Sequence, residues 1–331
     1  MSFGKSVHYR KDSISSKKII TLDKKWWKGS KYIQENKSTA LITIPKTGDL
    51  IHRIYVTSST PGIINCDDII DNVKITIGEQ VIDRHSKEYL QILSKISVST
   101  DSKQKKCKDK YEDHYSSDSK NSIENSIENS NDTVQIPLQF WFCRNIDLAL
   151  PLISLRYHQV KLEFTWGKIE DIGVAAELDI KVEYFFLNLY EGRRFLCNEH
   201  EYLIEQLQTN QIPMKQINTF DFIYPIKELY WTISDNFSYN KAELSLNGNS
   251  VNGMMPEEYY QLQQPLKDIN YYSLGLKYEY RSLSMVFNYP DINSINLKFK
   301  EYNPESIVNV YSVNYNILRI MGGLAGLAYI Y

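Results

Sequence analysis

Two parts of this 331-residue chain repeat each other in the same order, and this duplication constrains the fold more than any other feature. The stretch 49–57, DLIHRIYVT, is followed by 73–92, and the stretch 224–232, YPIKELYWT, is followed by 242–262. In both halves an alternating segment, a tight turn containing glycine and the pattern Glu-Tyr-x-Gln then come in succession. Repeats of this kind are typical of duplicated structural units. The sequence therefore predicts two similar domains in tandem.

A third echo, between VKLEF at 160–164 and INLKF at 295–299, tests this interpretation by its spacing. The gap before the echo is about 34 residues longer in the first half than in the second. The segment 99–132, which is charged, rich in Ser and Asn and contains the tandem NSIENSIENS, has that length. Such a composition buries too little apolar surface to offset the loss of chain entropy. We therefore expect a flexible surface insert at about 99–132. When this insert is left out, the repeated stretches of the two halves have the same spacing.

Apolar residues alternate with polar residues along many short stretches, which is the pattern of strands with one buried face. Turn-forming residues separate several of these stretches. Many short alternating strands with turns between them are typical of an all-β sandwich. The predicted strands cover residues 40–44, 50–56, 73–77, 158–166, 178–186, 229–233, 242–246 and 295–299.

Two of the turns have a defined chemistry. Asn247-Gly248 lies between alternating stretches, and this dipeptide supplies the two positive φ angles of a tight hairpin. Gly78 is expected at the strained position of a second hairpin, because glycine adopts positive φ without steric cost. We therefore predict Gly78, Asn247 and Gly248 as structural turn positions.

One stretch in the middle of the chain has helical periodicity instead. In EGRRFLCNEHEYLIEQLQ, residues 191–208, leucines recur on one helical stripe, at Leu196, Leu203 and Leu207. Its position suits a connector between two domains. The sequence thus predicts an N-terminal domain over 1–190, a connecting helix over 191–208 and a C-terminal domain over 209–331.

Charge and cysteine spacing argue against several classes of function. The chain has 38 basic and 40 acidic residues, which gives no basic surface for nucleic acid. Its four cysteines lie far apart, without the spacing of a zinc or redox motif, and we expect them to be reduced thiols. The apolar stretches 147–166 and 317–331 contain Arg156 and Arg319, and neither provides the ~20 apolar residues of a membrane-spanning helix.

Four stretches together resemble the major capsid proteins of nucleocytoplasmic large DNA viruses, the double jelly-roll family. They are VKITIGEQVIDRH at 73–85, the segment 136–164 around DLALPLISLRYHQVKLEF, RRFLCNEHEYLIEQLQ at 193–208, and the C-terminal 310–331. The resemblance covers the chain from roughly residue 40 to its end. The residues that we assign to the core of this signature are Leu150, Pro151, Leu152, Val160, Leu162, Phe164, Leu318, Gly322 and Gly323.

The resemblance implies an all-β fold of two tandem eight-stranded jelly rolls with a short inter-domain helix. It implies a structural protein of the virion capsid, whose homotrimers have a pseudo-hexagonal outline and tile an icosahedral shell. The implied partners are the chain itself, neighbouring capsomers and minor capsid proteins, with the inner viral membrane nearby. Synthesis is expected in the viral factory in the host cytoplasm. The resemblance implies no catalysis, no cofactor, no metal and no sequence-specific binding of nucleic acid.

Departures from the family pattern leave two related roles open. The chain is short for the family, and residues 280–292, YRSLSMVFNYPDI, lack the family's Pro-Ser-Gly…Asn-Phe-Ser-Arg stretch. Trp26 and Trp27 lie in an N-terminal segment that matches the family poorly. A divergent or minor capsid paralogue and a transient scaffold of virion assembly are therefore alternatives to the main shell protein.

Enzymatic and glycan-binding roles are less well supported by the sequence. The six histidines are dispersed and form no His-x-His metal motif, and no nucleophile elbow, phosphate loop or dinucleotide fingerprint is present. A carbohydrate-binding β-sandwich would use exposed aromatic side chains, which the 25 tyrosines allow. Core and interface packing explains aromatic residues more often. We therefore predict that the chain is not an enzyme, and a glycan-binding module remains as an alternative.

Overall fold

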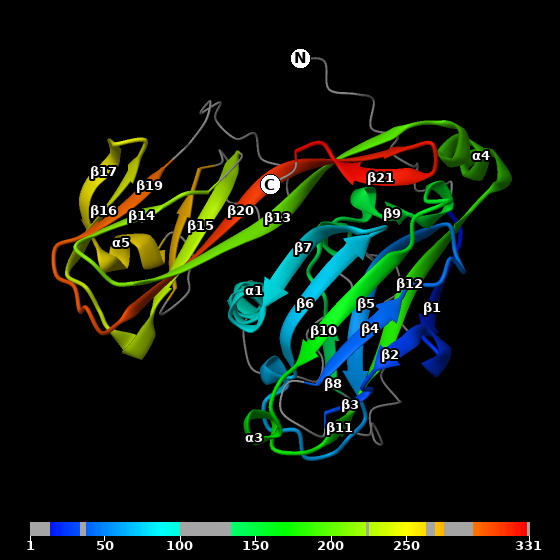
Figure 1. The fold of residues 1–331 in the computed structure, drawn as a ribbon, viewed down its shortest axis with the longest axis horizontal. Coiled ribbons are helices and arrows are strands. Elements are labelled where there is room, and N and C mark those ends of the chain that lie inside the picture. The colour runs from blue at the N-terminus through cyan, green and yellow to red at the C-terminus, as the bar shows by residue number, and fades with distance from the viewer. Residues whose placement is uncertain are drawn as a thin grey trace, which may run out of the picture.

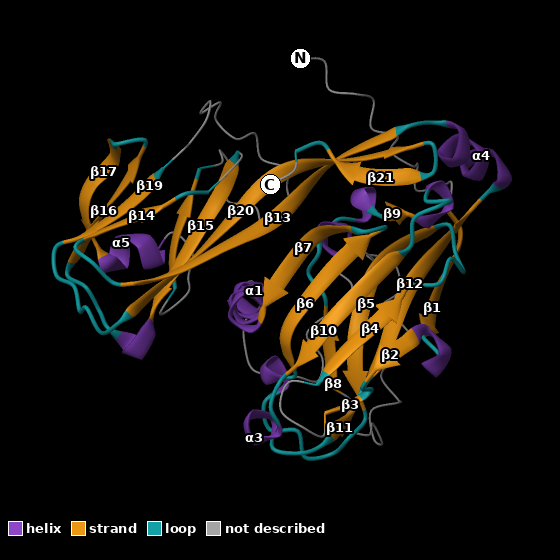
Figure 2. Cartoon of the chain, viewed as in Figure 1, coloured by secondary structure: helices purple, strands orange, loops and turns teal. Residues whose placement is uncertain are grey.

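The computed structural model describes residues 14–33, 38–99, 134–222, 225–262, 269–274 and 294–329. Strands dominate, and they form two sandwiches that lie side by side (Figure 1). Helices are short and lie at the edges of the sheets or between the sandwiches (Figure 2). The predicted all-β class with two jelly rolls is confirmed.

The first jelly roll consists of two sheets and a small ribbon. One sheet has the order β1-β12-β5-β8, with β9 also paired to β5, and the other has the order β2-β4-β10-β6-β7; β3 and β11 form the ribbon. The strands are β1 (Ile14–Thr21), β2 (Trp27–Gly29), β3 (Tyr32–Ile33), β4 (Thr39–Thr43), β5 (Leu50–Ser58), β6 (Ile70–Ile77), β7 (Gln80–Ser86), β8 (Val134–Pro137), β9 (Leu150–Pro151), β10 (Val160–Trp166), β11 (Ala176–Glu177) and β12 (Asp179–Leu187).

The second jelly roll also consists of two sheets. One has the order β13-β20-β15-β18, with β21 paired to β20, and the other has the order β14-β19-β16-β17. The strands are β13 (His200–Pro213), β14 (Ile217–Phe220), β15 (Ile226–Ile233), β16 (Lys241–Leu246), β17 (Asn249–Pro256), β18 (Asn270–Ser273), β19 (Ile295–Phe299), β20 (Ile307–Met321) and β21 (Leu324–Leu327).

The two jelly rolls have the same topology, so the duplication in the sequence is a duplication of the fold. The order β1-β12-β5-β8 corresponds to β13-β20-β15-β18, and β4-β10-β6-β7 corresponds to β14-β19-β16-β17. The three echoes in the sequence lie on β5 and β15, on the hairpins β6-β7 and β16-β17, and on β10 and β19. Each unit thus has the eight strands of a jelly roll.

Each jelly roll has its own apolar core, formed by the alternate residues that face inward. Val160, Leu162 and Phe164 of β10 are buried in the first core, and Ile295, Leu297 and Phe299 of β19 in the second. Full burial of one such side chain contributes ~1.5–3 kcal/mol. The equivalent strands therefore stabilise the two units in the same way.

In the described part of the chain, five α-helices and several short 3-10 turns connect the strands. The helices are α1 (Lys87–Ser99), α2 (Trp141–Arg144), α3 (Ile169–Ile172), α4 (Leu189–Cys197) and α5 (Glu257–Leu262), and the turns are η2 (Lys24–Trp26), η3 (Cys66–Asp68), η4 (Ile146–Leu148), η5 (Leu152–Ser154) and η6 (Ser234–Asn236). Helices α1 and α5 contain the two Glu-Tyr-x-Gln patterns and were not predicted from the sequence. Each of them directly follows the second strand of a hairpin.

The predicted connecting helix over 191–208 is wrong in its second half. Helix α4 ends at Cys197, and β13 begins at His200 with alternating buried residues. The error has a simple origin, because Leu203 and Leu207 are four residues apart and this spacing fits both a helical stripe and one face of a strand. The predicted boundary at residue 209 also divides β13, which pairs along its whole length with β20.

Two other expectations concern the first jelly roll. The insert predicted at about 99–132 lies outside the described residues, apart from Ser99 at the end of α1. The expectation of reduced cysteines is wrong for Cys66, which is disulfide-bonded, whereas Cys143 and Cys197 are free.

Within the described part of the chain, none of the helices has the length and apolar character needed to cross a membrane.

Candidate functional site

The junction between the jelly rolls holds the two units in one arrangement, and helix α1 is its apolar part. Tyr89 and Ile92 of α1 are buried against the outer face of the β13-β20-β15-β18 sheet. The ring of Tyr89 lies 6.1 Å from that of Tyr311 on β20 and 6.5 Å from that of Tyr230 on β15, measured between centroids. A helix of the first unit thus covers an aromatic surface of the second.

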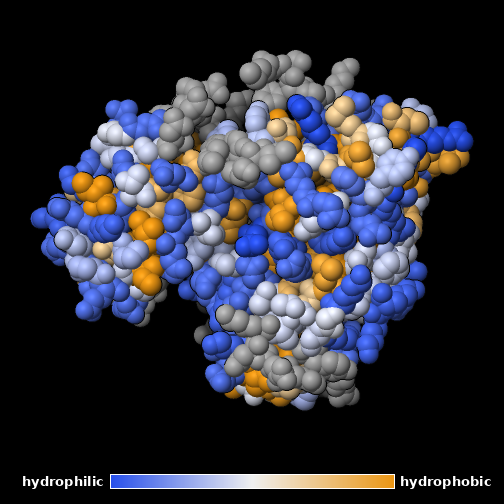
Figure 3. All heavy atoms as spheres, viewed as in Figure 1, coloured by the Kyte–Doolittle hydropathy of each residue, from blue (hydrophilic) through white to orange (hydrophobic). Residues whose placement is uncertain are grey.

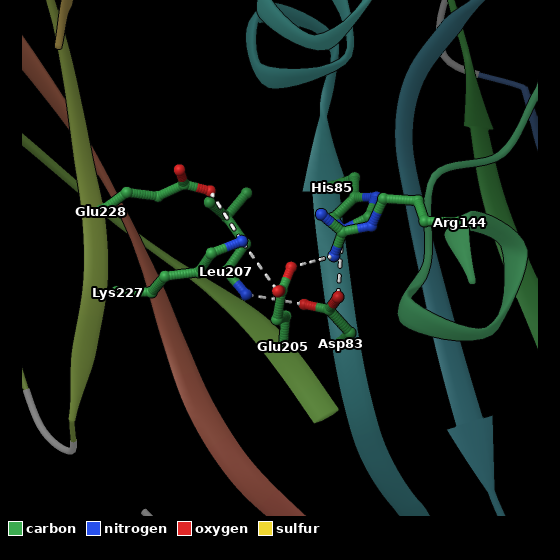
Figure 4. A network of polar contacts seen from close by, with 7 residues as sticks. All are labelled: Asp83, His85, Arg144, Glu205, Leu207, Lys227 and Glu228. Carbon is green, nitrogen blue, oxygen red and sulfur yellow. Dashed lines mark hydrogen bonds and ion pairs between the residues drawn. The ribbon is translucent and has the colours of Figure 1, made fainter. Parts of the chain in front are cut away.

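Beside this apolar contact lies a buried network of charged side chains (Figure 4). Glu205 on β13 accepts from Arg144 Nη2 of α2 at 2.7 Å and from Lys227 Nζ of β15 at 2.9 Å. Lys227 also lies 3.6 Å from a carboxylate oxygen of Glu228. The Tyr271 hydroxyl donates to the other Glu228 oxygen at 3.0 Å. Arg144 is the contribution of the first jelly roll, so the network ties the two units together.

Strand β7 adds a second set of polar contacts to the same junction. Asp83 accepts from the backbone N–H of Leu207 on β13 at 3.0 Å and from His85 Nε2 at 3.0 Å (Figure 4). The Gln206 side-chain amide donates to the carbonyl of Ile82. Asp83 and His85 are both buried. Strands β7 and β13 are thereby joined through side chains, although they belong to different sheets.

The electrostatics of the junction keep the Glu205–Lys227 pair ionised. Burial opposes the charge on Glu205, but Arg144 and Lys227 outweigh it and hold the pKa of this carboxyl below its ordinary value. Burial likewise opposes the charge on Lys227, but Glu228 and Glu205 outweigh it and hold the pKa of this ammonium above its ordinary value. Removal of one partner would leave a buried charge without compensation.

The C-terminal hairpin β20-β21 is the third part of the junction, because it packs on the first jelly roll. Leu318 and Ile320 of β20 belong to the first core and not to the second. The Gly323 carbonyl accepts from the Tyr157 N–H at 3.1 Å, and the Ala325 N–H donates to His158 Nδ1 at 3.1 Å. The end of the chain thus completes the core of the unit formed by its beginning.

The structure brings most of the predicted signature residues together in the first core. The apolar ones on β9, η5, β10 and β20 are all buried: Leu150, Pro151, Leu152, Val160, Leu162, Phe164 and Leu318. Gly322 and Gly323 form the β20-β21 turn, with φ of 59° and 88°. The buried residues among them thus lie in the core on which the C-terminal hairpin packs.

The predicted turn residues lie in the two equivalent hairpins. Gly78, with φ of 64°, lies between β6 and β7. Asn247 and Gly248, with φ of 49° and 80°, lie between β16 and β17. Among the described residues, no group of three or more His, Cys, Asp and Glu side chains is arranged to hold a metal ion.

Sequence reasoning missed the residues of the junction network: Asp83, His85, Arg144, Glu205, Lys227 and Glu228. A signal for two of them was present, because Lys227 and Glu228 lie within YPIKELYWT, a stretch whose other residues are mostly apolar. Charged residues in such a strand are rarely buried unless they are paired. Their partners lie on other elements, so the sequence alone did not identify the network.

Comparisons with known proteins agree with this architecture. The family model described as "Major capsid protein N-terminus" matches residues 28–184. The major capsid protein of Pyramimonas orientalis virus is 33% identical to this chain. The alignment covers 86% of this chain and 85% of that protein. The major capsid protein of Paramecium bursaria Chlorella virus 1 is 26% identical, with 86% of each chain covered.

A solved structure has the same fold. The chain superposes on the structure described as "PBCV-1 virus capsid, quasi-atomic model" with a TM-score of 0.71 and 23% identity, and all of both chains is covered. This likeness shows the shared double jelly roll, while the curated relatives show the family. The chain belongs to the major capsid protein family of nucleocytoplasmic large DNA viruses.

Proposed function

We propose that this structural capsid protein assembles as a homotrimer with a pseudo-hexagonal outline, and that these trimers tile an icosahedral shell. The observation that carries the proposal is the presence of two jelly rolls with the same strand order in one firmly joined chain. Three such chains place six similar units around one axis. Closed symmetric rings of this kind are the usual form of homo-oligomers.

The proposal extends to partners and location. Neighbouring capsomers and minor capsid proteins would contact the outer sides of each trimer, and the inner viral membrane would lie nearby. Synthesis would take place in the viral factory of the host cytoplasm. We propose no catalytic step, because a subunit with this role acts through its contacts, and the relatives reported above are described as capsid proteins.

The predicted turn and signature residues have a structural part in this proposal. Gly78, Asn247 and Gly248 would fix the two equivalent hairpins, and the signature residues would fix the C-terminal hairpin on the first jelly roll. We further propose that the domain boundary lies at helix α4, with β13 as the first strand of the second unit.

Sedimentation velocity of the purified chain tests the trimer directly. We expect a species of three times the chain mass that persists on dilution. A chain that remains monomeric at high concentration would contradict the proposal.

The homologues favour a shell component over a transient scaffold or a glycan-binding module.

Quantitative mass spectrometry of purified virions tests the place of the protein in the particle. A high copy number is expected for the main shell protein, and a low copy number would indicate a minor component. Absence from virions, with presence in infected cells, would instead support a scaffold.

A further inference from the structure

The internal duplication breaks down at the helix that follows each hairpin. Helix α1 follows β7, and helix α5 follows β17. The shared Glu-Tyr-x-Gln pattern aligns Tyr89 with Tyr259 and Ile92 with Leu262. Tyr89 and Ile92 are buried against the next jelly roll. Tyr259 is half-buried, and Leu262 is 80% exposed, more than any other large hydrophobic side chain in the described part of the chain.

The surface that α1 covers in the second jelly roll also has an equivalent in the first. Tyr230 on β15 lies opposite Tyr311 on β20 and Tyr271 on β18, and these tyrosines form the surface under α1. The residue equivalent to Tyr230 is Tyr55 on β5, which lies opposite Lys181 on β12 and Pro137 on β8. Tyr55, Lys181 and Pro137 thus occupy, on the β1-β12-β5-β8 sheet, the positions that receive a helix on the second sheet.

These residues face away from the core of their own unit. On β5, Ile54 and Val56 lie in the first core, so Tyr55 between them points to the opposite face. On β12, Ile180 and Val182 lie in the same core, so Lys181 points outward in the same direction. Tyr55, Lys181 and Pro137 are all half-buried. They form a partly apolar surface with one positive charge.

Charge complementarity identifies what this surface would receive. At the contact within the chain, burial and then the Glu88 carboxylate raise the pKa of Tyr311, and Tyr89, the neighbour of Glu88 on α1, lies with its ring 6.1 Å from that of Tyr311. The equivalent of Glu88 is Glu258 of α5, and the equivalent of Tyr311 is Lys181. The same docking geometry would therefore bring an exposed carboxylate to an ammonium group. Within the described residues, neither Glu258 nor Lys181 forms a salt bridge.

We propose that α5 of one copy packs on the Tyr55–Lys181–Pro137 surface of a second copy, repeating between chains the contact that α1 makes within the chain. Leu262 and Tyr259 would supply the apolar part, and Glu258 would pair with Lys181. One contact repeated six times around an axis, alternately within and between chains, closes a ring of three chains. The inference rests on the proposed trimer and names its contact surface.

A charge exchange tests the polar part of this contact. Lys181→Glu and Glu258→Lys should each raise the dissociation constant of the trimer, by about tenfold. The double variant should restore association, because the pair is re-formed with reversed charges. Glu79→Lys, a charge reversal at a side chain that is 99% exposed in the β6-β7 turn, is the matched control and should have no effect.

An apolar exchange tests the other part. Leu262→Asp should give monomers at concentrations where the wild type is trimeric, and its circular dichroism spectrum should remain that of the folded wild type. Ile64→Asp, at a side chain that is 74% exposed in a loop of the first jelly roll, should leave the trimer intact. A wild type that is monomeric at every concentration tested would overturn both the proposed trimer and this contact. A trimer that forms equally well with Leu262→Asp and with both single charge reversals would overturn the contact alone.

Cross-linking provides a readout that does not depend on affinity. The rings of Tyr89 and Tyr311 lie 6.1 Å apart within the chain, so Tyr259→Cys and Lys181→Cys should lie within reach of a short thiol cross-linker between copies. In a Cys197→Ser background, the paired variant should give covalently joined chains, and either variant alone should not. Intact trimers without such links would contradict the proposed surface.

Discussion

Helices α1 and α5 occupy equivalent places in the two jelly rolls, but their environments differ. Helix α1 has 13 residues, and its apolar side is buried between the units; α5 has six residues, and Leu262 at its end is exposed. The strands around them have the same order and pairing. The difference shows that α1 makes its contact within the chain, and in our proposal α5 makes the equivalent contact between chains.

The two receiving surfaces differ in chemistry as well. Tyr230, Tyr271 and Tyr311 give the second jelly roll an aromatic surface that is buried under α1. The equivalent positions of the first jelly roll are Tyr55, Pro137 and Lys181. Permanent interfaces are more apolar than those that form from separate partners. The aromatic surface therefore suits a permanent junction, and the mixed surface suits a contact that forms between chains.

The surface of the molecule is consistent with few, defined contacts. The face shown in Figure 3 is mainly hydrophilic, with separate apolar patches over both jelly rolls. Scattered exposed apolar residues are normal on soluble proteins. An assembly contact therefore requires a positional argument, such as the equivalence of Ile92 and Leu262, and does not follow from exposure alone.

The permanence of the intrachain junction can be tested by removing its central cation. Lys227→Met should destabilise the protein by ~3–5 kcal/mol, because Glu205 and Glu228 would remain buried without their shared partner. Urea unfolding followed by circular dichroism measures this effect. Lys298→Met, which removes an exposed partner 4.0 Å from Glu243, is the control and should cost less than ~1 kcal/mol. Equal effects of the two substitutions would show that the junction network contributes no more than a surface pair.

The dependence of the first jelly roll on the end of the chain can be tested at Leu318. Leu318→Ala should destabilise the protein by ~2–5 kcal/mol, because it leaves a cavity in the first core. Hydrogen exchange of β10 should become faster, although β10 is more than 150 residues away in the sequence. Leu324→Ala, at a side chain that is 47% exposed in the same hairpin, should change stability by less than ~0.5 kcal/mol. Faster exchange confined to the second jelly roll would contradict this packing.

A smaller effect should distinguish the turn of the C-terminal hairpin from that of the β16-β17 hairpin. Gly323 and Gly248 both have positive φ, 88° and 80°, so alanine at either position should cost ~1 kcal/mol in backbone strain. A Cβ atom at Gly323 would also lie 2.9 Å from Cβ of Arg156, whereas one at Gly248 would meet no atom within 4 Å. Gly323→Ala should therefore lower the melting temperature more than Gly248→Ala. The reverse order would show that the hairpin is not packed tightly on residue 156.

Much of the fold could be predicted from the sequence, because alternation reports directly on which face of a strand is buried. Strands β10 and β19 follow strict alternation, and both were predicted. Where two periods fit the same residues, prediction failed, as at Leu203 and Leu207. Helix α1 was not predicted, because its Glu-Tyr-x-Gln pattern indicates the duplication but is too short to show a helical period.

The junction was less predictable for a different physical reason. Glu205 lies on β13, Arg144 on α2 and Asp83 on β7, and their contacts depend on how two units pack. Periodicity gives the face on which a residue lies but not the element that packs against it. Leu318, in contrast, was singled out by resemblance, and its burial in the first core emerged only from the structure.

The smallest expected effect concerns the pH dependence of stability and is expected at the start of β13. His200, the first residue of β13, donates through Nε2 to the Phe195 carbonyl at 2.7 Å, and its Nδ1 has no hydrogen-bond partner among the described residues. Burial lowers the pKa of His200 in the folded chain. Below about pH 6.5 the unfolded chain therefore binds a proton at this histidine more readily than the folded chain does. Stability should therefore fall as the pH decreases below 6.5. It should fall further below about 4.5, where the lowered pKa of Glu205 has the same consequence.

Thermal unfolding of the wild type and of His200→Gln between pH 7 and pH 5 isolates the first of these steps. Glutamine can still donate to the Phe195 carbonyl but does not titrate, so the variant should lose less stability over this range than the wild type. The stabilisation that Glu205 provides is fully present above pH 4.5, its pKa in the unfolded chain. It therefore stays constant over the range measured and does not contribute to the difference between the two proteins. Parallel curves for the two proteins would assign the acid sensitivity to other groups. A flatter curve for the variant would place the first acid-sensitive step at His200, at the start of β13.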